Sequence, residues 1–263
     1  MKTAIVTGAY GAIGKAIAAG LAHDNDFHVI MAGRNARELE NAASGLRRQS
    51  GNGNISVHSL DLSILSEIEK FAAVVSGPVH VLVNNASTTP RQRMESAEGI
   101  EMQWAVNVLA YYRMICAFTP HLAQAGKARI VNVASYWAGG LDLGDPEFKQ
   151  RRYHNDTAYR QSKQADRMLT HSFAELLAEK NITVNACHPG DVNSKLSNNL
   201  GYGGHETPEQ GADTPVWLAV SEEVEGITGK YFEHRQETYC SFMRDLESVR
   251  KLFELCETYW IDD

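Results

Sequence analysis

Short runs of β-branched and apolar residues alternate with helical patterns along the whole chain, and this alternation restricts the fold strongly. The predicted strands lie at residues 3–7, 27–31, 55–60, 79–83, 129–134, 182–187 and 229–232. The predicted helices lie at residues 11–22, 36–49, 63–75, 99–125, 157–180, 208–220 and 241–259. Repeated strand–helix units join parallel strands by right-handed crossovers, which place helices on both faces of the sheet. We therefore expect an α/β fold, a doubly wound parallel sheet of about seven strands.

The length of the chain fits one domain. A chain of 263 residues can bury a large core, and no repeat or low-complexity linker marks a boundary within it. We expect a single domain over residues 1–263. Two stretches, 137–156 and 189–207, lack a regular pattern. Irregular stretches of this length inside a compact domain are usually functional, so both are predicted to be substrate loops.

The charge of the chain argues against several kinds of partner. The 32 acidic and 25 basic side chains leave a net charge of −7, so neither nucleic acid nor an anionic membrane is expected to bind. No apolar run approaches the roughly 18 residues of a membrane span, and the N-terminal run is too short for a signal peptide. We expect a cytoplasmic protein with no membrane span. The four cysteines form no C-x-x-C pair, which predicts reduced thiols and no metal site.

A glycine-rich turn follows the first predicted strand. The sequence Gly8-Ala9-Tyr10-Gly11-Ala12-Ile13-Gly14 joins that strand to the start of a helix. Glycines let backbone amides approach an anion closely, and the N-terminus of the helix adds the positive end of its dipole. This context indicates the pyrophosphate site of a dinucleotide, and the alternative is a plain tight turn.

The end of the second predicted strand indicates which dinucleotide binds. About 20 residues beyond the glycine turn, sites for NAD often carry an acid that binds the ribose 2′-hydroxyl. This chain has Arg34 there, and a guanidinium can pair with a 2′-phosphate. NADP(H) is therefore the preferred cofactor and NAD(H) is possible. The alternative is a solvated arginine at the start of a helix.

The predicted helix at 157–180 carries a tyrosine and a lysine four residues apart. Tyr159 and Lys163 therefore share one face of the helix. A free tyrosine has a pKa of about 10, and an ammonium about 4 Å away can lower it to about 7. The pair could then transfer a proton near neutral pH, and the alternative is an ordinary exposed pair. Residues at three- and four-residue steps are predicted to face the core, namely Ala158, Ser162, Ala165, Leu169, Phe173 and Leu176.

The glycine turn and the helix of Tyr159 and Lys163 together resemble the short-chain dehydrogenase/reductase family, whose usual form is a single Rossmann-type domain of about this length. Asp61-Leu62 resembles the pair that contacts adenine, and Asn84-Asn85-Ala86-Ser87 resembles the N-N-A-G motif. Further motifs extend the resemblance over nearly the whole chain. Val106-Asn107-Val108 is similar to the segment of the catalytic asparagine, and residues 131–135 are similar to the strand ending in the catalytic serine. His188-Pro189-Gly190 is similar to the turn beside the nicotinamide.

The resemblance implies two sets of site residues. The implied catalytic residues are Asn107, Ser135, Tyr159 and Lys163. The implied cofactor-binding residues are Thr7, Gly8, Tyr10, Gly11, Ala12, Ile13, Gly14, Arg34, Asp61, Leu62, Asn85, Ala86, Ser87, Tyr159, Lys163, Pro189, Gly190 and Val192.

The resemblance also implies a role for each catalytic residue. Tyr159 would exchange a proton with the substrate oxygen while the nicotinamide exchanges the hydride. Lys163 would lower the pKa of that tyrosine and hold the nicotinamide ribose. Ser135 would hydrogen-bond the substrate oxygen, and Asn107 would keep a water in a proton relay through Lys163.

Three features resemble the retinol dehydrogenase-like members of the family. Ser135 and Tyr159 stand 24 positions apart, so residues 137–156 look like the insertion of that subgroup. The ending Gly229-Lys230-Tyr231-Phe232 and the terminal helix resemble it as well. One departure concerns the glycine turn, where Ala12 replaces the glycine of the classical form and Gly11 stands one place earlier.

We expect an NADP(H)-dependent oxidoreductase that interconverts a carbonyl and an alcohol on a small-molecule substrate. One alternative is a C=C reductase similar to protochlorophyllide reductases, which residues 28–32 resemble. The other is a non-catalytic regulatory protein that senses NADP(H), although the complete catalytic set favours an enzyme. By analogy with the family, a homodimer or homotetramer would form through the helices at 99–125 and 157–180.

Overall fold

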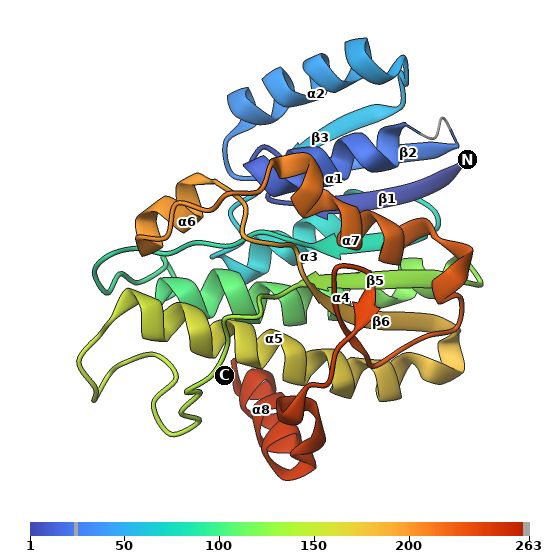
Figure 1. The fold of residues 1–263 in the computed structure, drawn as a ribbon. Coiled ribbons are helices and arrows are strands. Elements are labelled where there is room, and N and C mark those ends of the chain that lie inside the picture. The colour runs from blue at the N-terminus through green and yellow to red at the C-terminus, as the bar shows by residue number, and fades with distance from the viewer. Residues whose placement is uncertain (24–25, 260–263) are drawn as a thin grey trace.

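The computed structural model, which describes residues 1–23 and 26–259, contains one twisted sheet between two layers of helices (Figure 1). The strands run in the order β3-β2-β1-β4-β5-β6-β7-β8, and only β7 and β8 are antiparallel. Their bounds are β1 Lys2–Thr7, β2 Phe27–Gly33, β3 Ile55–Ser59, β4 Val81–Asn84, β5 Ala128–Val133, β6 Ile182–His188, β7 Tyr231–Glu233 and β8 Gln236–Glu237. The predicted α/β fold class is therefore confirmed.

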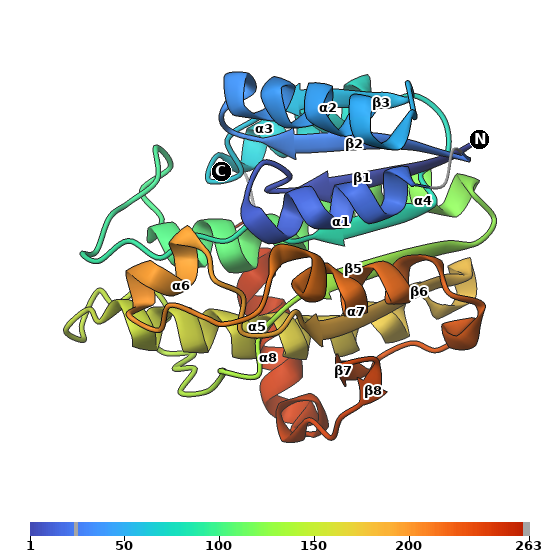
Figure 2. The same ribbon diagram turned by 45° about the horizontal axis from the view of Figure 1, so that its top comes forward.

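Side chains of alternate strand residues point to the two helical layers. In β1, Ala4 and Val6 belong to one buried cluster, while Ile5 belongs to the other. The first cluster lies against α1 (Ala12–Ala22), α2 (Ala36–Ser50) and α7 (Pro208–Val220), and Figure 2 shows α1 and α7 in front of the sheet. The second lies against α3 (Leu65–Val74), α4 (Ala110–Gln124) and α5 (Asn155–Leu177). The sheet is thus doubly wound, as the sequence predicts.

The described part of the sheet has one strand more than the predicted seven. The short strand β8 pairs with β7 across the two-residue turn His234-Arg235, where both residues have positive φ angles of 48° and 61°. A turn of this kind matches the twist of a hairpin, but Asn or Gly usually marks it in a sequence. Without such a signal, the hairpin was not predictable.

The predicted helix at 99–125 begins later than expected. Gly99 has a φ of +76°, and the Glu101 carboxylate accepts the backbone N–H groups of Gln103 at 3.0 Å and Trp104 at 2.8 Å. The helix then opens as a π-helix, η1 (Trp104–Leu109), which leads into α4. A π-helical turn inside an α-helix often lies at a functional site, because it redirects a side chain.

The predicted loop at 189–207 contains a helix. The segment α6 (Lys195–Leu200) is capped by Ser194, whose hydroxyl accepts the N–H of Ser197. Six residues are too few to show a helical period, which explains why the pattern missed it.

Helix α5 ends where the sequence predicts, but its buried face differs by one residue. A short 3-10 turn, η2 (Ala178–Lys180), leads to Asn181, whose φ of +57° stops the helix. Leu176 is 59% exposed, whereas Leu177 is buried. The prediction for Leu176 is therefore wrong, because the four-residue step from Phe173 continues the buried stripe and the three-residue step leaves it.

The terminal helix packs on the face of α5. A 3-10 turn, η4 (Ser241–Arg244), precedes α8 (Leu246–Thr258), whose Leu252 and Cys256 are buried. The Phe253 ring lies 5.2 Å from that of Tyr112 on α4 and 5.4 Å from that of Phe173 on α5. Helix α8 therefore covers part of α4 and α5, the two helices through which the predicted oligomer would form. Within the described ranges, no helix has the length and apolar character needed to cross a membrane.

The order of the strands determines where a ligand can bind. After β1 the chain builds β2 and β3 on one side of it, and it then returns to place β4 on the other side. Ligands of open α/β sheets bind at such a switch point, outside the carboxyl ends of the strands. The glycine turn follows β1 at this end of the sheet.

Candidate active site

The glycine turn after β1 has a geometry that requires glycine at two positions. Gly8 has a φ of +64°, and the Gly11 N–H donates to its carbonyl at 3.0 Å. A Cβ atom on Gly14 would lie 2.3 Å from that carbonyl oxygen, closer than any side chain can approach. Gly11 is extended, with φ −68° and ψ 166°, and Ala12 is the first residue of α1. Ala12 is therefore accommodated without strain, and the N-terminus of α1 stays open to a ligand.

Thr7 ties the ends of β1 and β4 together beneath the turn. Its hydroxyl donates to the Val83 carbonyl at 3.3 Å and accepts the N–H groups of Asn85 at 2.9 Å and Ala86 at 3.1 Å. The Asn85 amide donates back to the Thr7 carbonyl at 2.9 Å. Thr7 is buried, so it supports the glycine turn without being exposed to a ligand.

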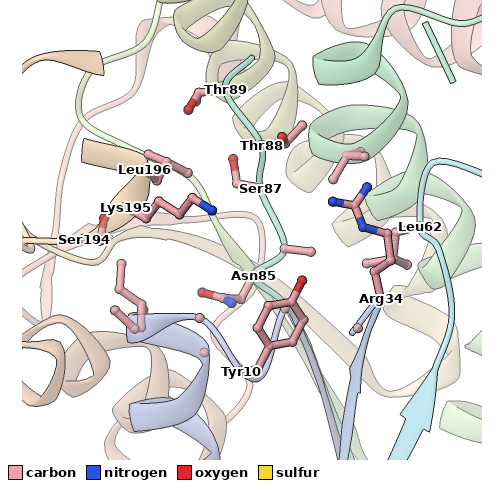
Figure 3. A pocket seen from close by; sticks show the side chains of 18 of the residues that line it. Tyr10, Arg34, Leu62, Asn85, Ser87, Thr88, Thr89, Ser194, Lys195 and Leu196 are labelled. Atoms are coloured by element: carbon pink, nitrogen blue, oxygen red, sulfur yellow. The ribbon is translucent and has the colours of Figure 1, made fainter. Parts of the chain in front are cut away.

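A first pocket of about 310 Å³ opens above the glycine turn. Twelve of the predicted cofactor residues line it, namely Gly8, Tyr10, Gly11, Ala12, Ile13, Gly14, Arg34, Asp61, Leu62, Asn85, Ala86 and Ser87. Figure 3 shows Arg34 on one side of this pocket and Lys195 extending into it from the other. Positive charge on two sides suits a ligand with several phosphates.

Arg34 is exposed and only loosely held in this pocket. Its Nη1 atom lies 3.8 Å from the Asp61 carboxylate, and the Arg34 side chain is 69% exposed. An exposed pair of this kind contributes at most about 1 kcal/mol, so the guanidinium can turn toward a phosphate at low cost. The Tyr10 ring packs against Gly33, where a Cβ would lie 2.8 Å from the ring.

A second pocket of about 370 Å³ contains five more of the predicted residues. Ser135, Tyr159, Pro189, Gly190 and Val192 all line it. The two pockets adjoin, because both are lined by Ile13, Ser194 and Leu196. The glycine turn and the tyrosine of α5 therefore face one continuous crevice.

Ser135 and Tyr159 meet on the wall of the second pocket. Both side chains are more than nine-tenths buried, and Ser135 lies close enough to the phenol to influence its pKa. Burial raises the pKa of the Tyr159 phenol to about 12, and the negative charges of Asp166 and Asp191 act in the same direction, while the nearby Ser135 hydroxyl opposes them. The predicted lowering of this pKa toward 7 is therefore not observed.

Lys163 explains this difference. Its ammonium donates to the Asp166 carboxylate at 2.8 Å and to the Val133 carbonyl at 3.0 Å, and it lies 5.9 Å from the centre of the Tyr159 ring. The Asp166 carboxylate, one turn further along α5, binds this ammonium and offsets its charge. Lys163 is fully buried and lies behind the residues that line the second pocket.

Asn107 belongs to η1, and its side chain forms hydrogen bonds with residues other than Lys163. Its Oδ1 accepts the Thr88 N–H at 2.8 Å, and its Nδ2 donates to the Thr88 carbonyl and to the Ser162 hydroxyl, each at 3.1 Å. The Ser162 hydroxyl donates in turn to the Tyr159 carbonyl at 2.7 Å. The Asn107 side chain thus holds the loop after β4 against the start of α5, and the implied proton relay stays a prediction.

Aromatic side chains outside the predicted catalytic and cofactor-binding sets line the second pocket. Trp137 and Tyr202 pack edge to face with ring centres 3.8 Å apart, and Tyr136 and His188 do so at 4.6 Å. Tyr136 and Trp137 directly follow Ser135 in the sequence, and that proximity could have identified them. Leu196 gave no signal, because α6 itself was not predicted.

The two predicted substrate loops differ in what they contribute to this pocket. Residues 189–207 supply most of its wall, including Asp191, Leu200 and His205. Of the insertion at 137–156, only Trp137 lines it among the described residues. The rest of the insertion folds on the buried Asp145 carboxylate, which accepts the backbone N–H groups of Lys149, Gln150 and Arg151.

His188 at the end of β6 should make the stability of the fold depend on pH. Burial lowers its pKa from 6.5 to about 3, and the nearby His234 and Arg167 act in the same direction. Between these values the unfolded chain binds a proton here and the folded chain does not, so stability falls as pH falls. The loss is at most about 1.4 kcal/mol for each pH unit.

We therefore expect His188→Gln to lose less stability in acid than the wild type. Urea unfolding of both proteins between about pH 7 and pH 4 measures the difference in the free energy of unfolding. The wild-type value should fall relative to that of the variant as pH decreases. A constant difference across this range would contradict the assignment of a neutral buried histidine.

Three comparisons with known proteins agree with this geometry. The family described as short chain dehydrogenase matches residues 2–203. Retinol dehydrogenase 13 of Homo sapiens is 32% identical over 273 residues, which cover 96% of this chain and 82% of the relative. A solved structure of an uncharacterised protein from Mycobacterium paratuberculosis has a TM-score of 0.83 and 27% identity, covering 98% of this chain and 92% of that one. A 3-oxoacyl (acyl-carrier-protein) reductase from Agrobacterium tumefaciens C58, solved with NADP bound, has a TM-score of 0.69 and 26% identity. The match covers 88% of this chain and 92% of that one.

Proposed function

The chain belongs to the short chain dehydrogenase family and is an oxidoreductase, and from this premise we propose that it uses NADP(H) to interconvert a carbonyl and an alcohol. The observation that carries the proposal is the position of Ser135 close to Tyr159 on the wall of a pocket that adjoins the glycine turn. The relative named retinol dehydrogenase agrees with the predicted resemblance to that subgroup.

The residues of the first pocket fit a nicotinamide dinucleotide. Gly8 and Gly14 leave no room for side chains, so backbone amides and the N-terminus of α1 can bind a pyrophosphate closely. We propose that Arg34 binds the 2′-phosphate of NADP(H) and that Lys195 contacts a phosphate from the opposite side. The NADP bound to the Agrobacterium reductase supports this preference, and NAD(H) is the alternative. When bound, the cofactor supplies or accepts the hydride.

Tyr159 is proposed to transfer the proton. With its pKa raised to about 12, the phenol is protonated at neutral pH, which is the form that donates a proton to a carbonyl oxygen during reduction. The Ser135 hydroxyl, close to the phenol on the same wall, can orient the same substrate oxygen. Lys163 is proposed to supply positive charge behind Tyr159, where charge develops as the proton leaves.

The substrate is proposed to be a fairly apolar small molecule. Trp137, Tyr202 and Leu200 present apolar surface to the second pocket. Asp191 lies at the same wall and disfavours a substrate with negative charge close to the reacting oxygen. The predicted homodimer or homotetramer and the cytoplasmic location stay predictions from sequence.

A titration of protein fluorescence with NADPH, followed by the loss of nicotinamide absorbance with a panel of aldehydes and ketones, tests the proposal. Quenching by NADPH and oxidation with at least one apolar carbonyl compound are expected. Binding without oxidation across a broad panel would favour the NADP(H)-sensing protein instead. Turnover that requires light would favour the protochlorophyllide reductase-like alternative.

A further inference from the structure

Helix α5 contains a buried carboxylate that the proposed mechanism does not use. Asp166 follows Lys163 by three residues, and both side chains are at least 98% buried. The Lys163 ammonium donates to the Asp166 Oδ2 atom at 2.8 Å. Burying two charges in a core is costly, so a pair that persists there requires a reason beyond stability.

The surroundings of the pair fix the position of the ammonium. The Lys163 Nζ atom donates to the Val133 carbonyl at 3.0 Å and lies 5.0 Å from the centre of the Tyr111 ring. The Tyr111 hydroxyl donates to the same carbonyl at 3.2 Å. The ammonium is therefore held between the end of β5, the start of α4 and its own helix, behind the phenol of Tyr159.

The other titratable groups that face the pair carry no charge at neutral pH. They are Tyr159 on α5, Tyr111 on α4, Cys187 on β6 and Cys256 on α8, and burial raises the pKa of each. Within the described part of the chain, Asp166 is the only carboxylate within 4.0 Å of the Lys163 ammonium. No described protein group donates to its other oxygen, Oδ1.

An ammonium in such a place cannot keep its charge alone. Desolvation favours the neutral amine, and buried lysines without a partner can titrate at about pH 5–6. Burial by itself would lower the pKa of Lys163, but the charge of Asp166, with help from Tyr111, reverses this and leaves the pKa raised.

We infer that Asp166 is a positioning residue, the counter-ion that keeps Lys163 charged inside the core and fixes its ammonium behind Tyr159. Its effect on turnover rests on the proposed function, because it acts through Lys163. Its effect on the charge of Lys163 does not depend on the proposed function, because that charge exists in the protein without cofactor.

A titration of lysine side chains by NMR tests the inference directly. Protein with ¹³C at the lysine ε-carbons is titrated as wild type and as Asp166→Asn, which keeps the shape and removes the charge, and Lys163→Met assigns the signal. We expect the midpoint of wild-type Lys163 to lie above that of an ordinary lysine, because the charge of Asp166 outweighs burial, and the Asn variant to titrate at least about two pH units lower. An unchanged midpoint in the folded Asn variant would overturn the inference.

The exposed pair of Lys230 and Glu237 provides a matched control. These side chains also lie 2.8 Å apart, but they are 37% and 52% exposed. Glu237→Gln should move the midpoint of Lys230 by no more than a few tenths of a pH unit, since water replaces the lost charge. A shift as large as that of Lys163 would show that burial is not what makes Asp166 necessary.

A double-mutant cycle covers the case in which Asp166→Asn does not fold. Urea unfolding compares Lys163→Met, Asp166→Leu and the double variant with the wild type. Because Asp166→Leu leaves a buried charge unpaired, the double variant should unfold at a higher urea concentration than that single variant. A double variant no more stable than Asp166→Leu would contradict the pairing.

A pH profile of NADPH oxidation separates this inference from the proposed function. In Asp166→Asn, kcat should fall with rising pH at the midpoint measured for Lys163 in that variant, whereas the wild type should show no step at that pH. If the proposed function is wrong, neither protein turns over, yet the NMR midpoint still falls. If the inference is wrong, turnover persists in both proteins and the midpoint does not move.

Discussion

Replacement of Tyr159 by phenylalanine is expected to lower kcat for carbonyl reduction by about 10³-fold, within the range of roughly 10²–10⁴ for general acid catalysis. The phenol is the group placed to give a proton to a substrate oxygen, and the Ser135 hydroxyl that touches it has no comparable acidity. The ring itself remains, so the pocket keeps its shape. Fluorescence quenching should give a Kd for NADPH within about twofold of the wild-type value, because only the proton transfer is lost.

Tyr136→Phe is the matched control for this experiment. Tyr136 lines the same pocket and also loses one phenol oxygen, but its ring is half exposed and packs against His188. It should keep kcat within about threefold, since its hydroxyl is not the group proposed to transfer the proton. Equal turnover of the wild type and Tyr159→Phe would refute the role of this tyrosine, and equal losses in both variants would point to a general disturbance of the pocket.

The parts of the site that the sequence predicted depend on local geometry. A strand, a glycine turn and a helix follow one another within residues 2–22, so the position of Gly8 and Gly14 beside the N-terminus of α1 follows from the chain order alone. The meeting of Ser135 and Tyr159 is less local. It was predicted only because the resemblance to the short-chain dehydrogenase/reductase family implies it, and no local pattern in the sequence indicates it.

The partner of Lys163 could not be predicted from spacing. Tyr159 lies four residues before it and Asp166 three residues after it, so both are neighbours on one helix face. Which of them the ammonium reaches depends on burial by η1, α4 and α8, elements distant in sequence. Leu176 and Leu177 illustrate the same limit, because a step of three or of four residues is equally helical and only the packed neighbours decide which side chain is buried.

The role of Arg34 gives the second large effect, a change in cofactor preference. In Arg34→Ala, affinity for NADPH should fall by about 10- to 100-fold, since a hydrogen bond to a charged group contributes roughly 1.5–3 kcal/mol and 1.4 kcal/mol is a factor of ten. Affinity for NADH, which lacks the 2′-phosphate, should change by less than about twofold. The side chain is 69% exposed and pairs with Asp61 only at 3.8 Å, so its removal should leave the fold intact.

Titrations of Arg34→Ala with both cofactors measure this effect, and Arg48→Ala in the last turn of α2 is the control. Arg48→Ala also removes one positive charge, but at the opposite end of α2 from Arg34. Any change in NADPH affinity that it causes therefore reflects the overall electrostatic field of the protein. A high-salt titration should weaken the contribution of Arg34, because it arises between exposed charges. Equal losses of affinity for NADPH and NADH in Arg34→Ala would mean that Arg34 supports the pocket without binding the 2′-phosphate. A preference for NADP(H) would then have to come from Lys195 or another group around the pocket.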